Sequence, residues 1–314
     1  MLQQTTVNAT EDYYRRWIRI FPTVRHVARA PLARILKTWQ GLGYYQRARN
    51  IHAASKIIVT KHGAKIPRDP EILKRLPGFG PYTVGAVLSI AFNLRYPIID
   101  ANVRRVFMRL MAFQSEAKPS CDPEILKNLK KILPERNMKI FNQALMELGA
   151  LVCRNREPLC VKCPVKRFCK AYERGIQEII PTPRKMIYKN FDVAIGILRR
   201  NNKYFVQKRP SKGLLAGLWE FPGGKIKSKE SVASALKREM KEEIHTDIIS
   251  QKFFMNAVHA YTNNRVKLHV FFCQPHTYPA QDKRHRWVTL RQIENYPMPS
   301  GSAKIIERLK QVSV

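Results

Sequence analysis

The sequence predicts two domains of different fold class: a mainly α N-terminal half that carries a metal-binding loop, and a smaller α/β domain. Apolar residues recur at helical spacing through residues 1 to about 150. Residues 176–190 contain two prolines and no apolar period, which is typical of a linker. Beyond them, strand-like runs alternate with an amphipathic helix. A length of 314 residues allows about two domains, so we expect them over 1–175 and 191–314.

Short glycine and proline breaks separate the expected helices of the N-terminal half. Two of these helices are indicated by apolar residues at i, i+3 and i+4, in the segments 32–39 and 51–58. A further helix is expected over 140–152, and it runs directly into a cysteine-rich stretch.

The C-terminal domain shows strand and helix signals in turn. Residues 191–198 and 203–208 are strand-like, and the Arg-Arg-Asn-Asn between them indicates a hairpin. Residues 232–243 have the period of an amphipathic helix, and residues 266–273 are expected to form another strand.

The chain is strongly basic, with 57 Lys and Arg against 23 Asp and Glu and a formal net charge of +34. Such an excess indicates a polyanionic partner, for which nucleic acid is the default. A membrane surface is the rival, but no apolar run approaches the roughly 20 residues of a spanning helix. A Lys-rich surface that is merely solvated is the third explanation. The first residues lack the features of a signal peptide, and we expect a cytoplasmic protein with no membrane partner.

Four cysteines follow the spacing C-x6-C-x2-C-x5-C: Cys153, Cys160, Cys163 and Cys169. The stretch around them is short, basic and poor in apolar residues, so we expect it to fold only around what it binds. Zinc usually takes two short cysteine pairs separated by a longer loop. One pair with a long arm on each side suits a [4Fe–4S] cluster better. Free thiols or disulfides are the alternative.

Residues 76–83, Leu-Pro-Gly-Phe-Gly-Pro-Tyr-Thr, lie between two helical patterns. Gly78 and Gly80 permit a tight turn and let backbone N–H groups approach a phosphate closely. This is the sequence of a helix–hairpin–helix, which grips the DNA backbone without reading its bases, although a plain helix-breaking turn looks similar. About twenty residues later, Asp100 precedes another helix. It is a candidate N-cap, and a carboxylate that the helix N-terminus would hold in its charged form.

A second set of polar residues in the C-terminal domain resembles a Nudix box. Its spacing is carried by Gly224, Glu230, Arg238, Glu239, Glu242 and Glu243. The last three glutamates fall at i, i+3 and i+4 of one helix, so their carboxylates are expected to converge. Such a set suits Mg²⁺ against a diphosphate, and a solvated acidic face is the alternative. One departure is His245, which stands where the box normally has glycine.

Taken together, these motifs resemble the MutY family of adenine DNA glycosylases, which are helix–hairpin–helix DNA glycosylases with an iron–sulfur cluster. Three more stretches are similar to the family, at residues 1–5, 41–50 and 141–144. The resemblance covers nearly the whole chain. It implies base-excision DNA repair, in which adenine opposite 8-oxoguanine or guanine in double-stranded DNA is removed by hydrolysis. It also implies a Nudix-like domain that recognises 8-oxoguanine, and a monomer that acts at the nucleoid.

The resemblance further implies which residues act in catalysis. The related endonuclease III branch has a nucleophilic Lys where this chain has Tyr82, so we expect no Schiff base and no strand cleavage. Asp100 matches the carboxylate that stabilises an oxocarbenium-like sugar, and Tyr82 matches a hydroxyl near that sugar.

Other residues are implied to contact DNA or its bases. Leu2 and Gln4 match positions at the flipped-base pocket and the gap in the duplex, and Gln143 matches a side chain that hydrogen-bonds adenine. Tyr44 matches an aromatic residue that intercalates beside 8-oxoguanine, and Thr262 takes the place of a hydroxyl residue near that base. Arg47 and Arg49 are expected phosphate contacts by their charge and placement.

One departure from the family bears on activity. The family's general acid, a Glu, lies two positions before the Met of Met-Leu-Gln-Gln-Thr, and this chain begins at that Met. Proton transfer from a positioned acid is typically worth about 10²–10⁴-fold in rate. Either the native start lies upstream, or the chain binds the mispair without cleaving it. A third hypothesis adds nucleotide pyrophosphohydrolase activity, with Mg²⁺ at the Nudix box.

Overall fold

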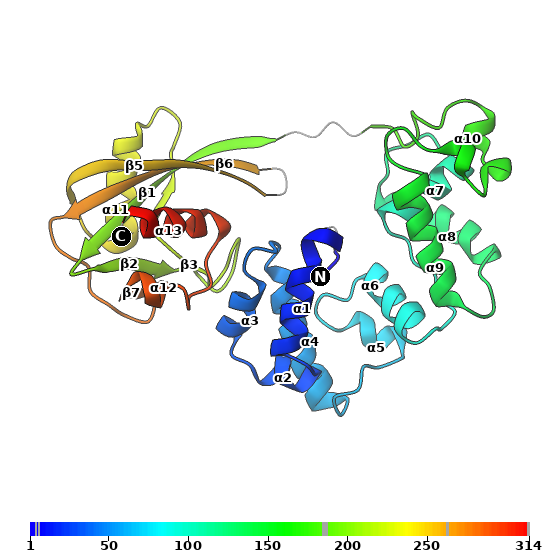
Figure 1. Cartoon of the computed structure of the whole chain (residues 1–314), viewed down its shortest axis with the longest axis horizontal. Coiled ribbons are helices and arrows are strands. Elements are labelled where there is room, and N and C mark those ends of the chain that lie inside the picture. Colours follow the sequence, from blue (N-terminus) through cyan, green and yellow to red (C-terminus); the bar gives the residue numbers. More distant parts are fainter. Residues whose placement is uncertain (4, 6, 184–187, 262–263, 313–314) are drawn as a thin grey trace. The chain divides into compact units, whose positions relative to one another are not determined.

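The computed structural model describes residues 1–3, 5, 7–183, 188–261 and 264–312. The chain forms two compact units. The first unit combines Met1–Lys56 with Met186–Val314, and the second is Ile57–Lys185. Figure 1 labels their helices and strands. None of the described helices is both long and apolar enough to span a membrane.

The N-terminal part of the first unit is a small helical layer. It consists of α1 (Val7–Ile20), α2 (Val24–Arg29), α3 (Leu32–Trp39) and α4 (Gln46–Lys61). The Trp17 and Trp39 rings meet edge to face with centroids 5.6 Å apart, in a core that includes Ile35 and Leu36. Leu218, from the C-terminal part of the chain, is fully buried in the same core. The helices therefore do not complete their hydrophobic core with their own residues.

Polar contacts join these helices to the C-terminal part of the same unit. The Tyr45 hydroxyl donates to the Met298 carbonyl at 3.0 Å, and the Met298 N–H donates to Gln40 Oε1 at 3.2 Å. Burial raises the pKa of Tyr45 to about 12, so the phenol stays protonated and acts as a donor. These bonds position α3 and α4 beside the sheet.

The C-terminal part of the first unit is built on a mixed seven-stranded sheet. Its order is β3-β2-β1-β6-β5, with β4 paired to β1 and β7 paired to β2. The strands are β1 (Lys189–Arg200), β2 (Lys203–Lys208), β3 (Trp219–Glu220), β4 (Gly223–Lys225), β5 (Ile248–Tyr261), β6 (Asn264–Pro275) and β7 (His285–Val288). The pair β1 and β6 is parallel, and the other pairs are antiparallel.

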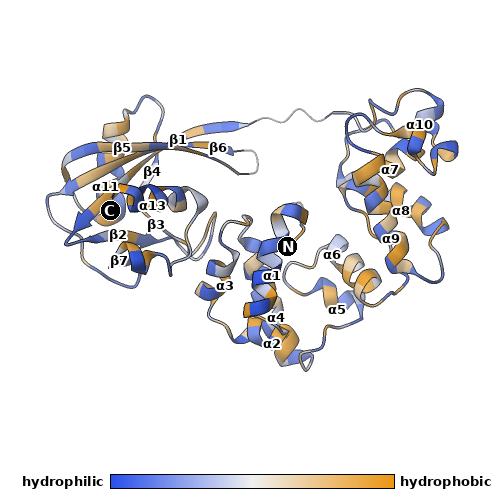
Figure 2. Cartoon of the chain, in the orientation of Figure 1, coloured by the Kyte–Doolittle hydropathy of each residue, from blue (hydrophilic) through white to orange (hydrophobic). Residues whose placement is uncertain are grey.

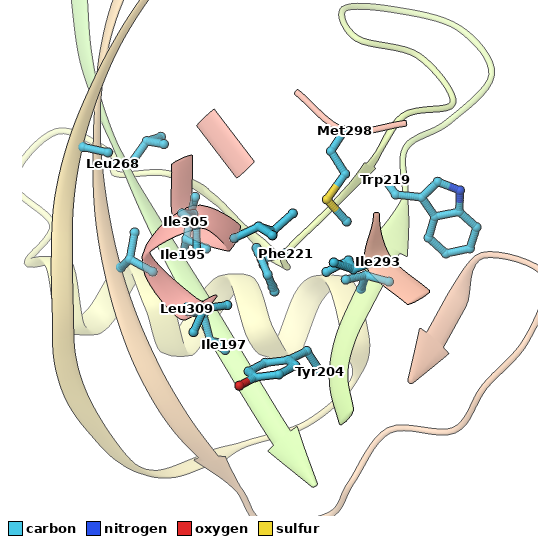
Figure 3. Packing of buried hydrophobic residues seen from close by; sticks show 14 of the residues in the cluster. Ile195, Ile197, Tyr204, Trp219, Phe221, Leu268, Ile293, Met298, Ile305 and Leu309 are labelled. Carbon is cyan, nitrogen blue, oxygen red and sulfur yellow. The ribbon is translucent and has the colours of Figure 1, made fainter. Parts of the chain in front are cut away.

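Helices cover both faces of this sheet. Alternate residues of β1 point to opposite sides, so Ile195 and Ile197 pack with α13 (Ser300–Val312) whereas Ala194 and Leu198 pack with α11 (Val232–Ile244). Figure 3 shows the first of these cores, in which Ile305 and Leu309 of α13 lie close to Ile195 and Ile197. The short helix α12 (Leu290–Ile293) adds Ile293 to the same core.

The second unit is helical. It contains α5 (Pro70–Lys74), α6 (Pro81–Ala86) with a π-helical turn Val87–Ala91, α7 (Ala101–Leu110), α8 (Asp122–Lys131), α9 (Met138–Glu147) with a π-helical turn Leu148–Val152, and α10 (Lys170–Glu173). Three 3-10 turns lie at Pro119–Cys121, Cys160–Lys162 and Lys166–Phe168. The core gathers apolar residues of α7, α8 and α10. Hydrophobic and hydrophilic residues alternate along the helices of both units, as expected of amphipathic helices (Figure 2).

The fold class predicted from the sequence is confirmed. The expected hairpin is formed by β1 and β2, and Asn201 and Asn202 take left-handed φ values of 46° and 61° in its turn. The helix expected over 232–243 is α11, and the strand expected over 266–273 is β6, which extends further at both ends. The helix expected over 140–152 is α9 followed by its π-helical turn. The boundaries expected at 175 and 190 stay a prediction.

A glycine in β4 tests the close packing of this sheet. A Cβ at Gly223, where φ is +144°, would lie 2.1 Å from the Ala194 carbonyl oxygen on β1. We expect Gly223→Ala to lower the free energy of unfolding by about 3 kcal/mol. Gly213→Ala is the matched control, because φ is +94° there but no heavy atom lies within 4 Å. Urea unfolding followed by tryptophan fluorescence measures both, and equal losses would contradict the packing argument.

Candidate functional site

Asp100 begins helix α7 as its N-cap. Its Oδ1 accepts a hydrogen bond from the Val103 N–H at 2.7 Å, and its Oδ2 accepts one from Asn102 Nδ2 at 3.0 Å. Both contacts, and the dipole of the helix behind them, stabilise a negative charge on the carboxylate. The N-cap predicted from the sequence is therefore confirmed. The side chain remains partly exposed, so its charge can act on a group outside the protein.

Tyr82 lies near this carboxylate in the second unit. It stands in the first turn of α6 and is partly buried. Burial raises the pKa of its phenol, and the negative charge of Asp100 raises it further. The hydroxyl therefore stays protonated and can donate a hydrogen bond. The two residues expected to act in catalysis thus come together in space, from elements about twenty residues apart in sequence.

A chain of hydrogen bonds connects Asp100 to the first cysteine. Asn102 accepts from Arg105 Nη2 at 3.0 Å. The same guanidinium donates to the Gly149 carbonyl at 2.6 Å and to the Cys153 carbonyl at 2.8 Å. A Cβ at Gly149 would lie 2.6 Å from Asn102 Cβ, so only glycine allows this approach. The carboxylate and the cysteine loop are therefore held in one rigid arrangement.

The four cysteines line one cavity. Burial raises the pKa of the Cys160 thiol, and the nearby Cys153, Cys169 and Cys163 affect it electrostatically. Burial likewise raises the pKa of Cys163. Over the described part of the chain, no three His, Cys, Asp or Glu side chains lie close enough together to hold one metal ion. The sulfur atoms thus face a common space without converging on a single point.

Arg109 is the charged residue at this cavity that sequence reasoning missed. Its side chain is only 1% exposed. Its guanidinium donates to Cys153 Sγ at 3.3 Å, and to the carbonyls of Ile180 at 2.7 Å, Arg154 at 2.6 Å and Asn155 at 3.2 Å. Among the described residues it forms no ion pair. A buried guanidinium without a carboxylate partner is costly, so this cavity favours an anion.

The other residues predicted in the second unit occupy the surface near α6 and α9. Gly78 is exposed with φ of +82°, and the exposed Gly80 is the N-cap of α6. The hairpin turn between α5 and α6 is therefore confirmed. Gln143 lies on α9 and is partly buried. Their contacts with DNA stay predictions.

A separate cavity of about 480 Å³ lies within the first unit. Residues from distant parts of the chain line it, including Thr5, Tyr44, Leu214, His259 and Ser300. Tyr44, one of the lining residues, is 44% exposed and takes a left-handed φ of 47°. Burial lowers the pKa of His259, and Lys304 lowers it further, so this imidazole is neutral at pH 7. An aromatic ring, hydroxyl groups and a neutral imidazole form a lining suited to a flat polar group.

Two arginines beside Tyr44 are bound within the protein. The Arg47 guanidinium lies 5.3 Å from the Tyr44 ring centroid and donates to the carbonyls of Met1, Gln3 and Leu42. Arg49 Nη2 donates to the Ala216 carbonyl. Their expected contacts with phosphate stay predictions. Leu2 is 54% exposed, whereas Gln4 and Thr262 lie outside the described residues.

The Nudix-box residues are organised around Arg238. Its guanidinium contacts Glu230 at 2.8 Å, Glu239 at 2.6 Å and Glu242 at 3.2 Å. The hydrogen bond from Arg238 lowers the pKa of Glu230 to about 2, with help from the Lys227 N–H. Glu230 is therefore a permanent anion that anchors the arginine.

Glu243 lies on the inner side of α11. It accepts hydrogen bonds from the Gly223 N–H at 3.0 Å and from Gln207. Burial raises its pKa, and Glu239 raises it further. Glu242 is the outermost of the three glutamates, with 55% of its side chain exposed. Glu239 and Glu243 are thus neighbours, while Glu242 faces solvent, and Mg²⁺ binding stays a prediction.

Two family models match the chain, and the first of them spans parts of both compact units. Residues 1–135 match the HhH-GPD superfamily of base excision DNA repair proteins, and residues 193–308 match the NUDIX domain. A solved complex of endonuclease III with DNA is 26% identical with a TM-score of 0.49, and covers 56% of this chain and 81% of that one. The two family matches together indicate the class: a base excision DNA repair protein that carries a NUDIX domain.

Relatives that match most of this chain identify the family more narrowly. The adenine DNA glycosylase of Schizosaccharomyces pombe is 30% identical over 349 residues, spanning 95% of this chain and 76% of that protein. The adenine DNA glycosylase of a Buchnera aphidicola subspecies, Acyrthosiphon pisum, is 31% identical over 316 residues, spanning 99% and 88%. The human adenine DNA glycosylase is 33% identical over 270 residues, spanning 71% and 50%. The chain belongs to the adenine DNA glycosylase family, which confirms the resemblance found in its motifs.

Proposed function

We propose that this chain removes adenine mispaired with 8-oxoguanine or guanine in double-stranded DNA by hydrolysing the N-glycosidic bond. The observation that carries the proposal is Asp100, a partly exposed carboxylate fixed at a helix N-terminus beside a protonated Tyr82. Membership of the adenine DNA glycosylase family supports the choice of base. The net charge of +34 suits a DNA substrate, and we infer that the protein acts at the nucleoid.

The residues of the second unit suit a reaction that develops positive charge on the sugar. A target base must leave the stack before its glycosidic bond can be reached. As the base departs, the negative charge of Asp100 stabilises the oxocarbenium-like sugar. Tyr82 offers a hydroxyl and no amine, so water and not the protein attacks the sugar. The product is an abasic site in an unbroken strand.

The cavity around Tyr44 supports recognition of the opposite base. Its aromatic ring can stack on a base, while Thr5, Ser300 and the neutral His259 supply hydrogen-bonding groups. We infer that this cavity receives 8-oxoguanine, with Leu2 filling the gap that the flipped adenine leaves.

Single-turnover release of adenine from an A:8-oxoguanine duplex tests the proposal. We expect Asp100→Asn to slow release by about 10³-fold, because it removes the charge. Asparagine is as good an N-cap as aspartate, so the melting temperature should hardly change. Asp69→Asn is the matched control, since Asp69 caps α5 with bonds to the Glu71 and Ile72 N–H groups. Tight duplex binding without adenine release by the unaltered chain would support a protein that only marks the mispair.

We further propose that Cys153, Cys160, Cys163 and Cys169 hold a [4Fe–4S] cluster. Each thiolate of such a cluster binds a different iron, and all four cysteines line one cavity. The buried Arg109 favours the negative charge of a thiolate-bound cluster. When bound, the cluster would brace the basic loop 153–169, and Arg105 would transmit this rigidity to Asp100.

Removing the buried charge tests the cluster proposal. We expect Arg109→Met to retain at most about a fifth of the iron and sulfide of the unaltered protein, because the thiolates lose a charge-assisted hydrogen bond. Arg109→Lys keeps a cation and should retain more. Arg95→Met is the control, since Arg95 is exposed and donates only to the Leu133 carbonyl. Iron and sulfide assays with the visible absorbance give the readout, and full loading of Arg109→Met would contradict the proposed role.

A second activity is supported by the arrangement of the Nudix box. Arg238 binds Glu230 and Glu239. The exposed Glu242 contacts Arg238 as well, and among the described residues this is its one hydrogen-bond partner. A Cβ at Gly224 would lie 2.3 Å from the Glu239 carboxylate, so a larger residue there would displace this carboxylate. We infer that these glutamates bind Mg²⁺ and that this domain hydrolyses a nucleoside diphosphate linkage.

Pyrophosphate release from 8-oxo-dGTP by the full chain, with and without Mg²⁺, tests this activity. We expect Glu242→Gln to lower the rate by at least about 10²-fold, while stability is retained because this side chain is largely exposed. Glu307→Gln on the exposed side of α13 is the control. Mg²⁺-independent release, or equal rates in Glu242→Gln and Glu307→Gln, would contradict the proposal that the Nudix box catalyses this hydrolysis.

A further inference from the structure

A basic cavity of about 540 Å³ in the first unit has no role in the reactions above. Its apolar wall comes from α3, through Leu32, Ala33 and Leu36, and its polar wall comes from the sheet and the segment before β7. The cationic residues that line it are Arg49, Lys208, Arg209, Lys283 and Arg284. None of the glutamates of the Nudix box lines it.

The positive charge of this cavity is only slightly compensated. Arg209 pairs with Glu220 at 2.7 Å, but no carboxylate lines the cavity itself. Arg49 donates to the Ala216 carbonyl, and Arg284 donates to the Lys208 carbonyl at 3.3 Å. Main-chain carbonyls hold a guanidinium in place but leave its net charge intact. Among the described residues, four of the five cations that line the cavity form no ion pair, so the cavity is electrostatically suited to an anion.

The backbone around the cavity makes room for this arrangement. Gly217 has φ of +63°, and a Cβ there would lie 3.0 Å from Arg49 Nη2. The absence of a side chain at Gly217 therefore leaves room for the Arg49 guanidinium next to the backbone. Burial lowers the pKa of Arg49, because its partly buried guanidinium has lost part of its hydration. A negatively charged ligand would supply the anionic partner that the lining of this cavity does not contain.

We propose that this cavity binds the phosphate groups of a nucleotide, either a free nucleoside triphosphate or part of a DNA strand. Its volume lies within the range of about 300–1,000 Å³ found for small-molecule sites, well above that of one phosphate ion. The basic residues suit the phosphates, and the apolar wall formed by α3 suits the base or sugar. The site is distinct from the cavity around Tyr44, although Arg49 lines both.

Equilibrium binding of three probes tests the site: dGTP, inorganic tripolyphosphate, and a short undamaged duplex. EDTA is present, so that Mg²⁺ at the Nudix box contributes nothing. We expect Lys283→Glu to weaken binding by about tenfold, and Arg284→Glu to act similarly, because each places a negative charge at the rim. Lys203→Glu is the matched control. It makes the same charge change at an exposed lysine of β2 that does not line the cavity.

The pattern over the three probes decides the outcome. Loss of dGTP and tripolyphosphate binding in Lys283→Glu, with Lys203→Glu unchanged, supports a site for free nucleotides. Loss confined to the duplex supports a contact with DNA phosphates. Equal affinities of Lys283→Glu and Lys203→Glu for all three probes would overturn the proposal, since binding would then reflect only the overall positive charge. None of these three results depends on adenine release or on pyrophosphate release.

Discussion

The buried guanidinium of Arg109 is the constraint on which the second unit depends. A charge at this depth must be matched by something negative, and the described residues around it supply only carbonyls and a thiol. The proposed thiolate-bound cluster would meet that need directly. The basic loop 153–169 leaves Val161 and Phe168 exposed, so electrostatics at the centre would stabilise it more than burial of these side chains.

Helix α7 links this charge to the chemistry. Its N-terminus fixes Asp100, its middle carries Arg105 toward Gly149 and Cys153, and its last turn buries Arg109. Helix α7 therefore fixes the distance between the Asp100 carboxylate and the cysteine loop that begins at Cys153. Since 1 Å of misplacement in a catalytic group can cost a large factor in rate, the proposed cluster would matter for the proposed base removal even at a distance from the sugar.

Much of this site could be predicted from local sequence. Asp100 before a helix, the glycines of the hairpin and the Nudix spacing are short-range signals, and the structure places each on the expected element. Arg109 could not be found in this way, because its burial depends on Ile180 and Arg154, which lie far from it in sequence. Three arginines on one short helix, Arg104, Arg105 and Arg109, are the signal that was available, and Arg109 is the one that becomes buried. Arg47 was expected to contact phosphate from its charge and placement, and the structure adds that carbonyls of Met1 and Leu42 bind it.

The fully buried Leu218 has a consequence for the order of folding. Helices α1 to α4 are synthesised before the second unit. Their hydrophobic core is completed only by Leu218, which is synthesised after the whole second unit. That second unit is continuous in sequence and can fold while the flanking segments are still apart. In topological terms it is an insertion within the first unit, so the earliest helices are among the last to become stable during synthesis.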